Sequence, residues 1–226
     1  MSEWVKLTAA DGVELDGYIA RPEGEPKGAL VVVQEIFGVN PHIQSVADDW
    51  AKEGFLCIAP AMFDRIEPGV SLNYDKPGWE RAMSFVPRLD MDKAALDVDA
   101  AVQWLRGETA VNVGVVGYCF GGTMAWLSTT RLKVEAAVGY YGGNIANFVN
   151  EEPQVPIMLH FGGQDAHIPA EMIAKIQTAH PEVPIFVYND AGHAFNRSAD
   201  PSAYVADAAR LAKSRSLLFF QQHLVF

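Results

Sequence analysis

VGVVGYCFGG, at residues 113–122, is the most informative stretch of the chain. Its apolar start is typical of a buried β-strand, and its glycine-rich end is typical of the turn into a helix. Cys119 lies between Gly117 and Gly121 in the pattern Gly-x-Cys-x-Gly. Glycines two residues to either side let a strand and a helix approach closely around a sharp turn. The stretch therefore predicts a nucleophile elbow that presents Cys119. The thiol faces the N-terminal end of the helix, where the helix dipole stabilises a thiolate.

The alternative is a buried structural cysteine in a glycine-rich turn, as in a dinucleotide-binding fold. The glycines of this turn do not have the spacing Gly-x-Gly-x-x-Gly. With 19 glycines and two cysteines in 226 residues, chance gives roughly 0.014 occurrences of Gly-x-Cys-x-Gly. We therefore favour the nucleophile.

Two later residues complete a triad in the chain order nucleophile, acid, histidine that this kind of elbow requires. Asp165 follows the apolar run 157–161 in the loop GGQD, and His193 follows the apolar run 185–188 in AGHAF. Both positions lie at the carboxyl end of a predicted strand, where α/β enzymes collect catalytic groups. We predict that His193 is the base and that Asp165 orients it.

Other assignments of these residue types remain open. Asp165 has the alternative of an ordinary turn or N-cap aspartate, and Asp190 is a competing acid that lies close to His193 in sequence. His167 is the rival base. His160 lies within an apolar run and is expected in the core, and the remaining histidines show no spacing for metal ligands. No metal site is predicted.

Short, nearly unbroken apolar runs recur along the chain and are typical of parallel strands that are covered on both faces. Helical patterns separate most of them, so the sequence predicts an α/β fold with a mostly parallel open sheet and helices on both faces. Residues 13–19 alternate apolar and polar side chains after a turn at Asp11 and Gly12, which predicts an antiparallel hairpin at the N-terminus. The predicted parallel strands are 29–33, 55–59, 111–116, 136–140, 157–161 and 185–188.

Two helices are predicted with explicit boundaries. Residues 91–106 carry an apolar stripe at three- and four-residue steps, and Gly107 is expected to end that helix. The last helix is expected to have Asp200 as its N-cap and Pro201 as its first residue, and to end near Leu224. The face that we expect it to turn to the sheet carries Tyr204, Ala208, Leu211 and Leu218.

No repeat or linker divides the sequence, so we expect one domain over residues 1–226. The irregular segment 60–78 holds three prolines and two glycines, and we expect it to form a wall of the binding site.

Composition excludes several function classes. The chain is 50% apolar and 20% charged, unlike disordered chains, and its net charge of −11 repels nucleic acid and anionic membrane surfaces. No apolar run approaches the length of a membrane span, and no signal peptide is evident. The two cysteines, Cys57 and Cys119, make no disulfide framework. We expect a cytoplasmic monomer.

With these features in place, the sequence resembles the dienelactone hydrolases of the α/β-hydrolase fold over nearly its whole length. Most α/β-hydrolases carry serine at the elbow, so the cysteine indicates this branch rather than lipases or peptidases. The resemblance rests on QEIFGVN at 34–40, GYCFGG at 117–122, AVGYYG at 137–142, GGQD at 162–165 and AGHAF at 191–195.

The resemblance implies further catalytic groups. Glu35 corresponds to a carboxylate that takes the thiol proton when substrate arrives, and its alternative is a structural carboxylate that holds loop amides. The backbone amides of Ile36 and Phe120 correspond to an oxyanion hole.

The family's substrate carries a carboxylate that two arginines bind. Arg197 matches one of them. Arg81 is the candidate for the second arginine. It lies about two residues away from the position at which the family carries this arginine, so that Trp79 or Met83 is the alternative occupant of that position. The resemblance also implies that Phe37 and Tyr140 line the substrate pocket.

The function expected from the resemblance is cofactor-independent hydrolysis of an enol lactone, a dienelactone opened to maleylacetate, through an acyl-thioester on Cys119. A broader esterase or thioesterase is the alternative if Arg81 does not reach the pocket. A non-enzymatic protein with a redox-sensing thiol at Cys119 is the third possibility. A small lactone or ester, carboxylate-bearing in the first case, is the expected partner.

Overall fold

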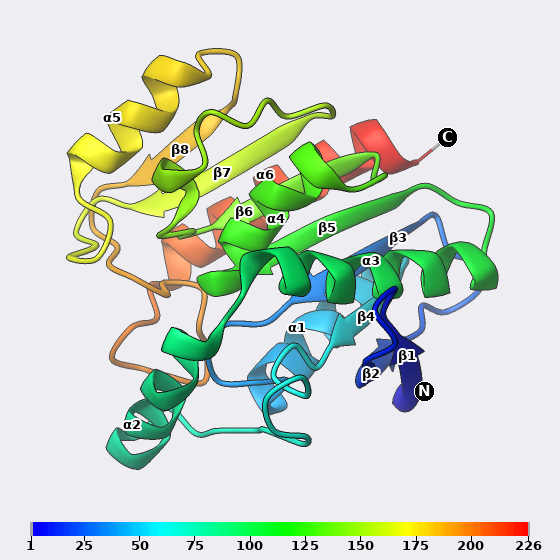
Figure 1. Cartoon of the computed structure of the whole chain (residues 1–226). Coiled ribbons are helices and arrows are strands. Elements are labelled where there is room, and N and C mark those ends of the chain that lie inside the picture. The colour runs from blue at the N-terminus through cyan, green and yellow to red at the C-terminus, as the bar shows by residue number, and fades with distance from the viewer. Residues whose placement is uncertain (1, 226) are drawn as a thin grey trace.

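The computed structural model describes residues 2–225, which form one eight-stranded sheet with helices on both of its faces (Figure 1). The strands are β1 (Ser2–Thr8), β2 (Glu14–Ala20), β3 (Gly28–Val33), β4 (Phe55–Pro60), β5 (Val113–Tyr118), β6 (Ala136–Tyr140), β7 (Ile157–Gly162) and β8 (Ile185–Tyr188). The helices are α1 (Pro41–Lys52), α2 (Lys76–Phe85), α3 (Met91–Glu108), α4 (Phe120–Arg131), α5 (Ala170–Ala179) and α6 (Ala206–Leu224), with short 3-10 turns η1 (Val86–Arg88) and η2 (Ile145–Asn147).

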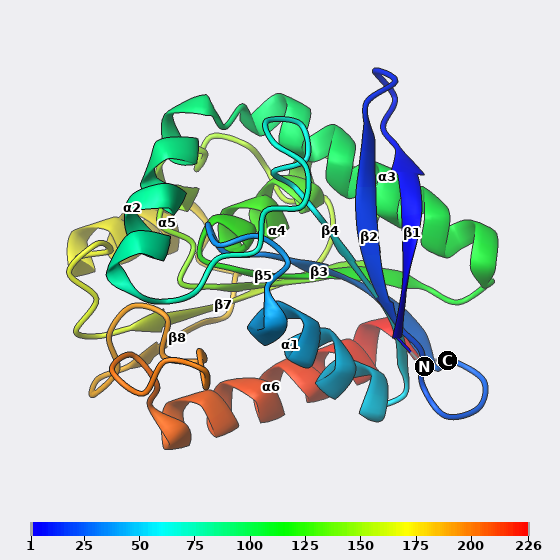
Figure 2. The same cartoon turned by 90° about the horizontal axis from the view of Figure 1, so that it is seen from below.

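The strand order is β1-β2-β4-β3-β5-β6-β7-β8. β1 pairs antiparallel with β2, and β2 pairs antiparallel with β4, whereas all later pairs are parallel. Helices α1 and α6 cover one face, and α3 and α4 cover the other (Figure 2). The predicted α/β-hydrolase architecture, with its N-terminal hairpin and parallel interior strands, is confirmed. β5 begins two residues later than predicted and continues to Tyr118.

Burial explains why the interior strands are almost wholly apolar. Every residue of β3, β4, β5, β6 and β7 is buried, because helices exclude water from both faces of these strands. On α3, the predicted apolar stripe faces the sheet. This helix continues through Gly107 to Glu108, two residues beyond the predicted end. Among residues 2–225, no helix has both the length and the apolar character that crossing a bilayer requires.

The predicted start of the last helix is wrong. Asp200 does not cap a helix: its carboxylate accepts hydrogen bonds from Arg197 and Ser202 and stabilises a turn instead. Val205 is extended, and α6 begins only at Ala206.

The predicted buried face of the last helix is wrong as well. Of the four residues assigned to it, Ala208 is buried, whereas Leu211 is 41% exposed and Leu218 is 67% exposed. Tyr204 precedes the helix and is partly exposed. The stripe that contacts the sheet is shifted by about one residue, a rotation of about 100°. It consists of Ala208, Ala209, Ala212, Ser216, Phe219, Phe220 and Leu224.

The irregular segment between β4 and α2 lies against the loop that follows β3. Leu72 donates its amide hydrogen to the carbonyl of Phe37, and the side chain of Asn40 donates to the carbonyl of Leu72. Gly38 has a φ of 78° and forms an isolated bridge with Ser71. These bonds hold the segment over the carboxyl end of β3, where the candidate site lies.

Candidate active site

Cys119 lies at the turn between β5 and α4, with φ 56° and ψ −113°. Such a positive φ costs a non-glycine residue about 1–3 kcal/mol and persists only where the surrounding structure enforces it. Two glycines allow the turn: a Cβ on Gly117 would lie 1.7 Å from the carbonyl oxygen of Gly121, and one on Gly121 would lie 2.2 Å from that of Val33. The strained elbow predicted from the sequence is present.

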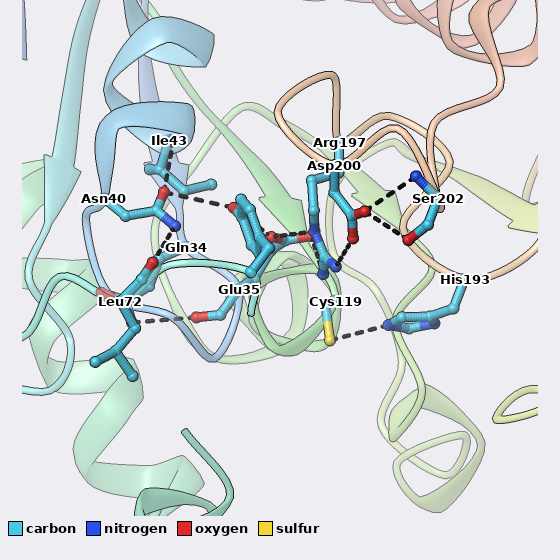
Figure 3. A network of polar contacts seen from close by, with 11 residues as sticks. Gln34, Glu35, Asn40, Ile43, Leu72, Cys119, His193, Arg197, Asp200 and Ser202 are labelled. Carbon is cyan, nitrogen blue, oxygen red and sulfur yellow. Dashed lines mark hydrogen bonds and ion pairs between the residues drawn. The ribbon is translucent and has the colours of Figure 1, made fainter. Parts of the chain in front are cut away.

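The structure brings Cys119, His193 and Asp165 together from three loops. The Nε2 atom of His193 lies 3.2 Å from the Cys119 sulfur, and its Nδ1 atom lies 2.7 Å from Oδ2 of Asp165. The other oxygen of Asp165 accepts the amide hydrogen of His167 at 2.8 Å. His167, the rival base, therefore contacts Asp165 through its backbone, while the ring of His193 contacts the sulfur. Figure 3 shows the thiol and this ring facing each other.

Electrostatics couple the three side chains. Burial alone would lower the pKa of His193, but the Cys119 sulfur and the Asp165 carboxylate outweigh burial and raise it to about 10. Burial would raise the pKa of Asp165, but the hydrogen bond and charge of His193, together with the contacts to His167, outweigh this and lower it. The imidazole is thus held in its protonated form as long as the sulfur carries negative charge.

Glu35 follows β3 and is fully buried. Arg197 donates to both of its oxygens, from Nε to Oε2 at 3.1 Å and from Nη2 to Oε1 at 3.1 Å. The hydroxyl of Tyr74 donates to Oε2 at 2.9 Å. Figure 3 shows this carboxylate held by Arg197. Glu35 therefore contacts Arg197 and Tyr74, rather than the thiol whose proton it was expected to take.

Arg197 is enclosed by two rings and two carboxylates. Its guanidinium lies 5.1 Å from the ring centre of Phe37 and 4.3 Å from that of Tyr74, and Nη1 contacts Asp200 at 3.3 Å. Burial would lower the pKa of Arg197, but the Glu35 carboxylate outweighs burial and raises it. Arg197 thus contacts Glu35, and the ring of Phe37 lies against its guanidinium.

The backbone amides expected to form the oxyanion hole belong to adjacent loops. Ile36 lies in the turn after β3, and Phe120 is the first residue of α4, where a backbone amide has no acceptor within the helix. Gly121 donates to the carbonyl of Gln34 at 3.0 Å and ties the two loops together. Within residues 2–225, neither the Ile36 nor the Phe120 amide donates to another loop, turn or side-chain group. Both are available to an external acceptor.

The structure does not bring Arg81 to Arg197. Arg81 lies on α2, where it forms an exposed ion pair with Glu67 and stacks over the ring of Phe85. Among residues 2–225, Arg81 shares no hydrogen-bond, ion-pair or ring-contact partner with Arg197. Trp79 and Met83, the alternatives for this position, are exposed on the same helix.

Tyr140 and Tyr141 point in different directions. The hydroxyl of Tyr140 is hydrogen-bonded to Ser216 of α6 at 2.8 Å, whereas the ring of Tyr141 lies 5.2 Å from the ring of His193. Sequence analysis missed Tyr141, although side chains alternate between the faces of a strand and this could have indicated it. It also missed Tyr74, and the one feature that could have indicated this residue is its place in segment 60–78, which was expected to form a wall of the binding site.

No cluster of three or more His, Cys, Asp or Glu side chains in residues 2–225 is arranged to hold a metal ion.

Comparison with known proteins identifies relatives over almost the whole chain. The model of the dienelactone hydrolase family matches residues 15–224. A carboxymethylenebutenolidase from Pseudomonas putida is 34% identical, with 97% of this chain and 96% of the relative covered. A candidate dienelactone hydrolase from Klebsiella pneumoniae superposes with a TM-score of 0.84 at 26% identity, covering 99% of this chain and 100% of that one. An α/β serine hydrolase homologue from Coxiella burnetii shares the fold, with a TM-score of 0.68 at 15% identity, 94% of this chain and 96% of that one.

Proposed function

The chain belongs to the dienelactone hydrolase family and is a hydrolase, and we propose that it opens an enol lactone through an acyl-thioester on Cys119. The observation that supports this most is the chain of contacts from Asp165 to His193 to the Cys119 sulfur. A nucleophile, its base and an orienting carboxylate in this geometry are the requirement for nucleophilic acyl transfer.

In the acylation step, the Cys119 thiolate attacks the carbonyl carbon and forms a carbon–sulfur bond. The carbonyl oxygen becomes an oxyanion that accepts hydrogen bonds from the amides of Ile36 and Phe120. When the oxyanion collapses, the ring carbon–oxygen bond breaks and an enolate leaves. The enolate takes up the proton that Cys119 has given to Glu35, directly or through solvent, and becomes a ketone.

In the deacylation step, His193 takes a proton from water, whose oxygen attacks the thioester carbon. The carbon–sulfur bond breaks, Cys119 leaves as a thiolate and a carboxylate product is released. The sulfur carries no charge in the thioester, so the attraction by which a thiolate holds a proton on His193 is absent at this stage. The imidazole can then act as a base.

Glu35 takes the thiol proton in this proposal, and Arg197 controls when it does so. Both oxygens of Glu35 are bound by Arg197 in the free protein. A substrate carboxylate that binds Arg197 competes with Glu35 for the same donors, which frees Glu35 to turn to Cys119 at the end of the neighbouring strand β5. Thiolate formation is thereby coupled to the binding of an anionic substrate.

The test is the kcat/KM for a carboxylate-bearing dienelactone compared with that for a neutral aryl acetate, with Cys119→Ala as the blank. A preference of about a hundredfold, or about 2.7 kcal/mol of transition-state discrimination, supports the proposal. Equal or reversed values contradict the substrate. Activity that survives in Cys119→Ala contradicts the nucleophile.

A broader esterase or thioesterase is the second candidate, and the position of Arg81 favours it. With Arg81 in an exposed ion pair with Glu67, Arg197 is the one arginine among residues 2–225 that contacts Glu35. A single arginine that is already engaged by two carboxylates binds an anionic substrate less strongly than two free ones. Similar kcat/KM values for neutral and anionic substrates are the expected result in this case.

A further inference from the structure

Tyr141 carries a buried hydroxyl group that the proposed mechanism does not use. Its side chain is fully buried, and within residues 2–225 the hydroxyl has no hydrogen-bond partner. The residue also has a φ of 40°, in the left-handed region that non-glycine residues rarely adopt. Buried unpaired polar groups and positive φ values are both unfavourable, and in native proteins they concentrate at functional sites.

Sheet register places Tyr141 in one row with Glu35 and Cys119. Val33 of β3 pairs with Gly117 of β5, and Tyr118 pairs with Tyr140 of β6. Cys119 and Tyr141 directly follow the last residues of β5 and β6, and Glu35 is the second residue after β3. These three strands are direct neighbours in the sheet. Adjacent strands lie about 4.8 Å apart, so all three residues lie at the same edge of the sheet, with Cys119 in the middle.

The surroundings of Tyr141 confirm this placement. Its ring lies 5.2 Å from the ring of His193 and 5.3 Å from that of Phe195. Burial raises the pKa of Tyr141 well above its ordinary value, and the Glu35 carboxylate raises it further, while Cys119 acts in the same direction. The hydroxyl therefore keeps its proton and can serve as a hydrogen-bond donor to a nearby anion.

We propose that Tyr141 is a positioning residue whose hydroxyl donates a hydrogen bond to Glu35 when this carboxylate leaves Arg197 and turns to Cys119. This inference rests on the role of Glu35 in the proposed function. In the free protein Arg197 and Tyr74 already supply the donors of Glu35. Once substrate has taken Arg197 and the carboxylate has turned away from Tyr74, it lacks both of these donors, and Tyr141 supplies one on the side of Cys119. The hydroxyl is unpaired in the free protein because its partner arrives only during catalysis.

Tyr141→Phe separates this role from a structural one, because it removes the hydroxyl and keeps the ring. Removal of an unpaired buried hydroxyl leaves the Tm unchanged or slightly raised. We expect kcat on the dienelactone to fall roughly tenfold to a hundredfold, the effect of one hydrogen bond to a charged group, while KM stays within about twofold. A lowered Tm with unchanged kcat would overturn the inference.

Tyr188→Phe is the matched control. The hydroxyl of Tyr188 is also buried, but it is bonded to Nδ1 of His160 at 3.0 Å and accepts from Arg215 at 3.2 Å. Its removal leaves polar partners unpaired, so this variant is expected to lose stability, with kcat within about twofold of the wild type. If kcat falls in Tyr141→Phe but not in Tyr188→Phe, the loss is specific to the Tyr141 hydroxyl and is not a general effect of removing a buried tyrosine hydroxyl.

A double-mutant cycle with Glu35→Gln tests whether Tyr141 acts through Glu35. If it does, Tyr141→Phe has no further effect on kcat in the Glu35→Gln background. The same loss in both backgrounds means that the hydroxyl acts on another group, and it overturns the inference while leaving the proposed function intact. Full activity of Glu35→Gln overturns both the role of Glu35 and this inference, whereas activity in Cys119→Ala contradicts the proposed function itself.

Discussion

Arg197 binds both carboxylate oxygens of Glu35, at 3.1 Å each, although the two residues are 162 positions apart in the sequence. The pair is buried, and it joins the loop after His193 to the loop that follows β3. Because the same guanidinium neutralises Glu35 and is the candidate anchor for a substrate carboxylate, stability and substrate recognition depend on the same contacts.

Arg197→Met is expected to destabilise the protein by about 3–5 kcal/mol, because it leaves the Glu35 carboxylate buried without its partner. The free energy of unfolding from urea titrations measures this. Adding Glu35→Gln removes the unpaired charge and should restore a large part of the loss. A single-variant cost below about 1 kcal/mol would show that the ion pair does not hold the site together.

Arg81→Met is the control for that variant, since Arg81 pairs with Glu67 at the surface. We expect a change in unfolding free energy within about 0.5 kcal/mol. The KM for a carboxylate-bearing substrate should not change, because no contact within the described residues 2–225 links Arg81 to Arg197. A rise in KM of tenfold or more would place Arg81 in the substrate site after all.

Gly121→Ala is expected to cost at least about 1–3 kcal/mol, because the added Cβ would lie 2.2 Å from the carbonyl oxygen of Val33, a backbone atom that cannot move aside cheaply. Gly107→Ala on α3 is the matched control. A Cβ there meets no atom within 4 Å, so the helix should gain up to about 1 kcal/mol. Thermal unfolding of both variants measures the contrast, and a tolerated Gly121→Ala would contradict the close approach of α4 to β3.

Asp97 gives the protein a predictable pH dependence. Burial raises its pKa to about 6, although Arg65 donates to Oδ2 at 2.7 Å and opposes this shift. The folded pKa lies above the ordinary value, so the folded state binds more protons than the unfolded state between about pH 4 and pH 6. The contribution of Asp97 to the free energy of unfolding therefore falls as the pH rises from about 4 to about 6.

The difference in unfolding free energy between the wild type and Asp97→Asn isolates this contribution. From about pH 4 to pH 7 the wild type should lose roughly 1–3 kcal/mol relative to the variant. Acids with lowered pKa values, such as Asp165, act in the opposite direction in both proteins and cancel in the difference. A difference that stays constant or grows in favour of the wild type would contradict the assignment.

The sheet and the contacts among Cys119, His193 and Asp165 could be predicted because their signals are local. Apolar runs mark each strand, and the glycines around Cys119 mark the elbow. Chain order then selects Asp165 and His193 from several acids and histidines. Each of these inferences needs only neighbouring residues and the rule that parallel strands end at one edge of a sheet.

What could not be predicted depends on side chains that meet across the fold. The sequence gives no sign that Asp200 contacts Arg197 and Ser202 rather than capping a helix, and α6 therefore starts later than its cap residue indicated. The contact between Tyr74 and Glu35 depends on how a long irregular loop folds back over β3. Alternation along the strand indicates that Tyr140 and Tyr141 point to opposite sides, but which of the two lies beside His193 depends on the strand's register.

The most direct test of the account is to trap the acyl group. The protein is mixed with a slowly hydrolysed ester, quenched in acid within the first turnovers and digested for peptide mass mapping. We predict a mass gain of one acyl group on the peptide that contains Cys119, released by neutral hydroxylamine as a thioester is, and absent from Cys119→Ala. An acyl group on another residue, or turnover that persists in Cys119→Ala, would contradict the account.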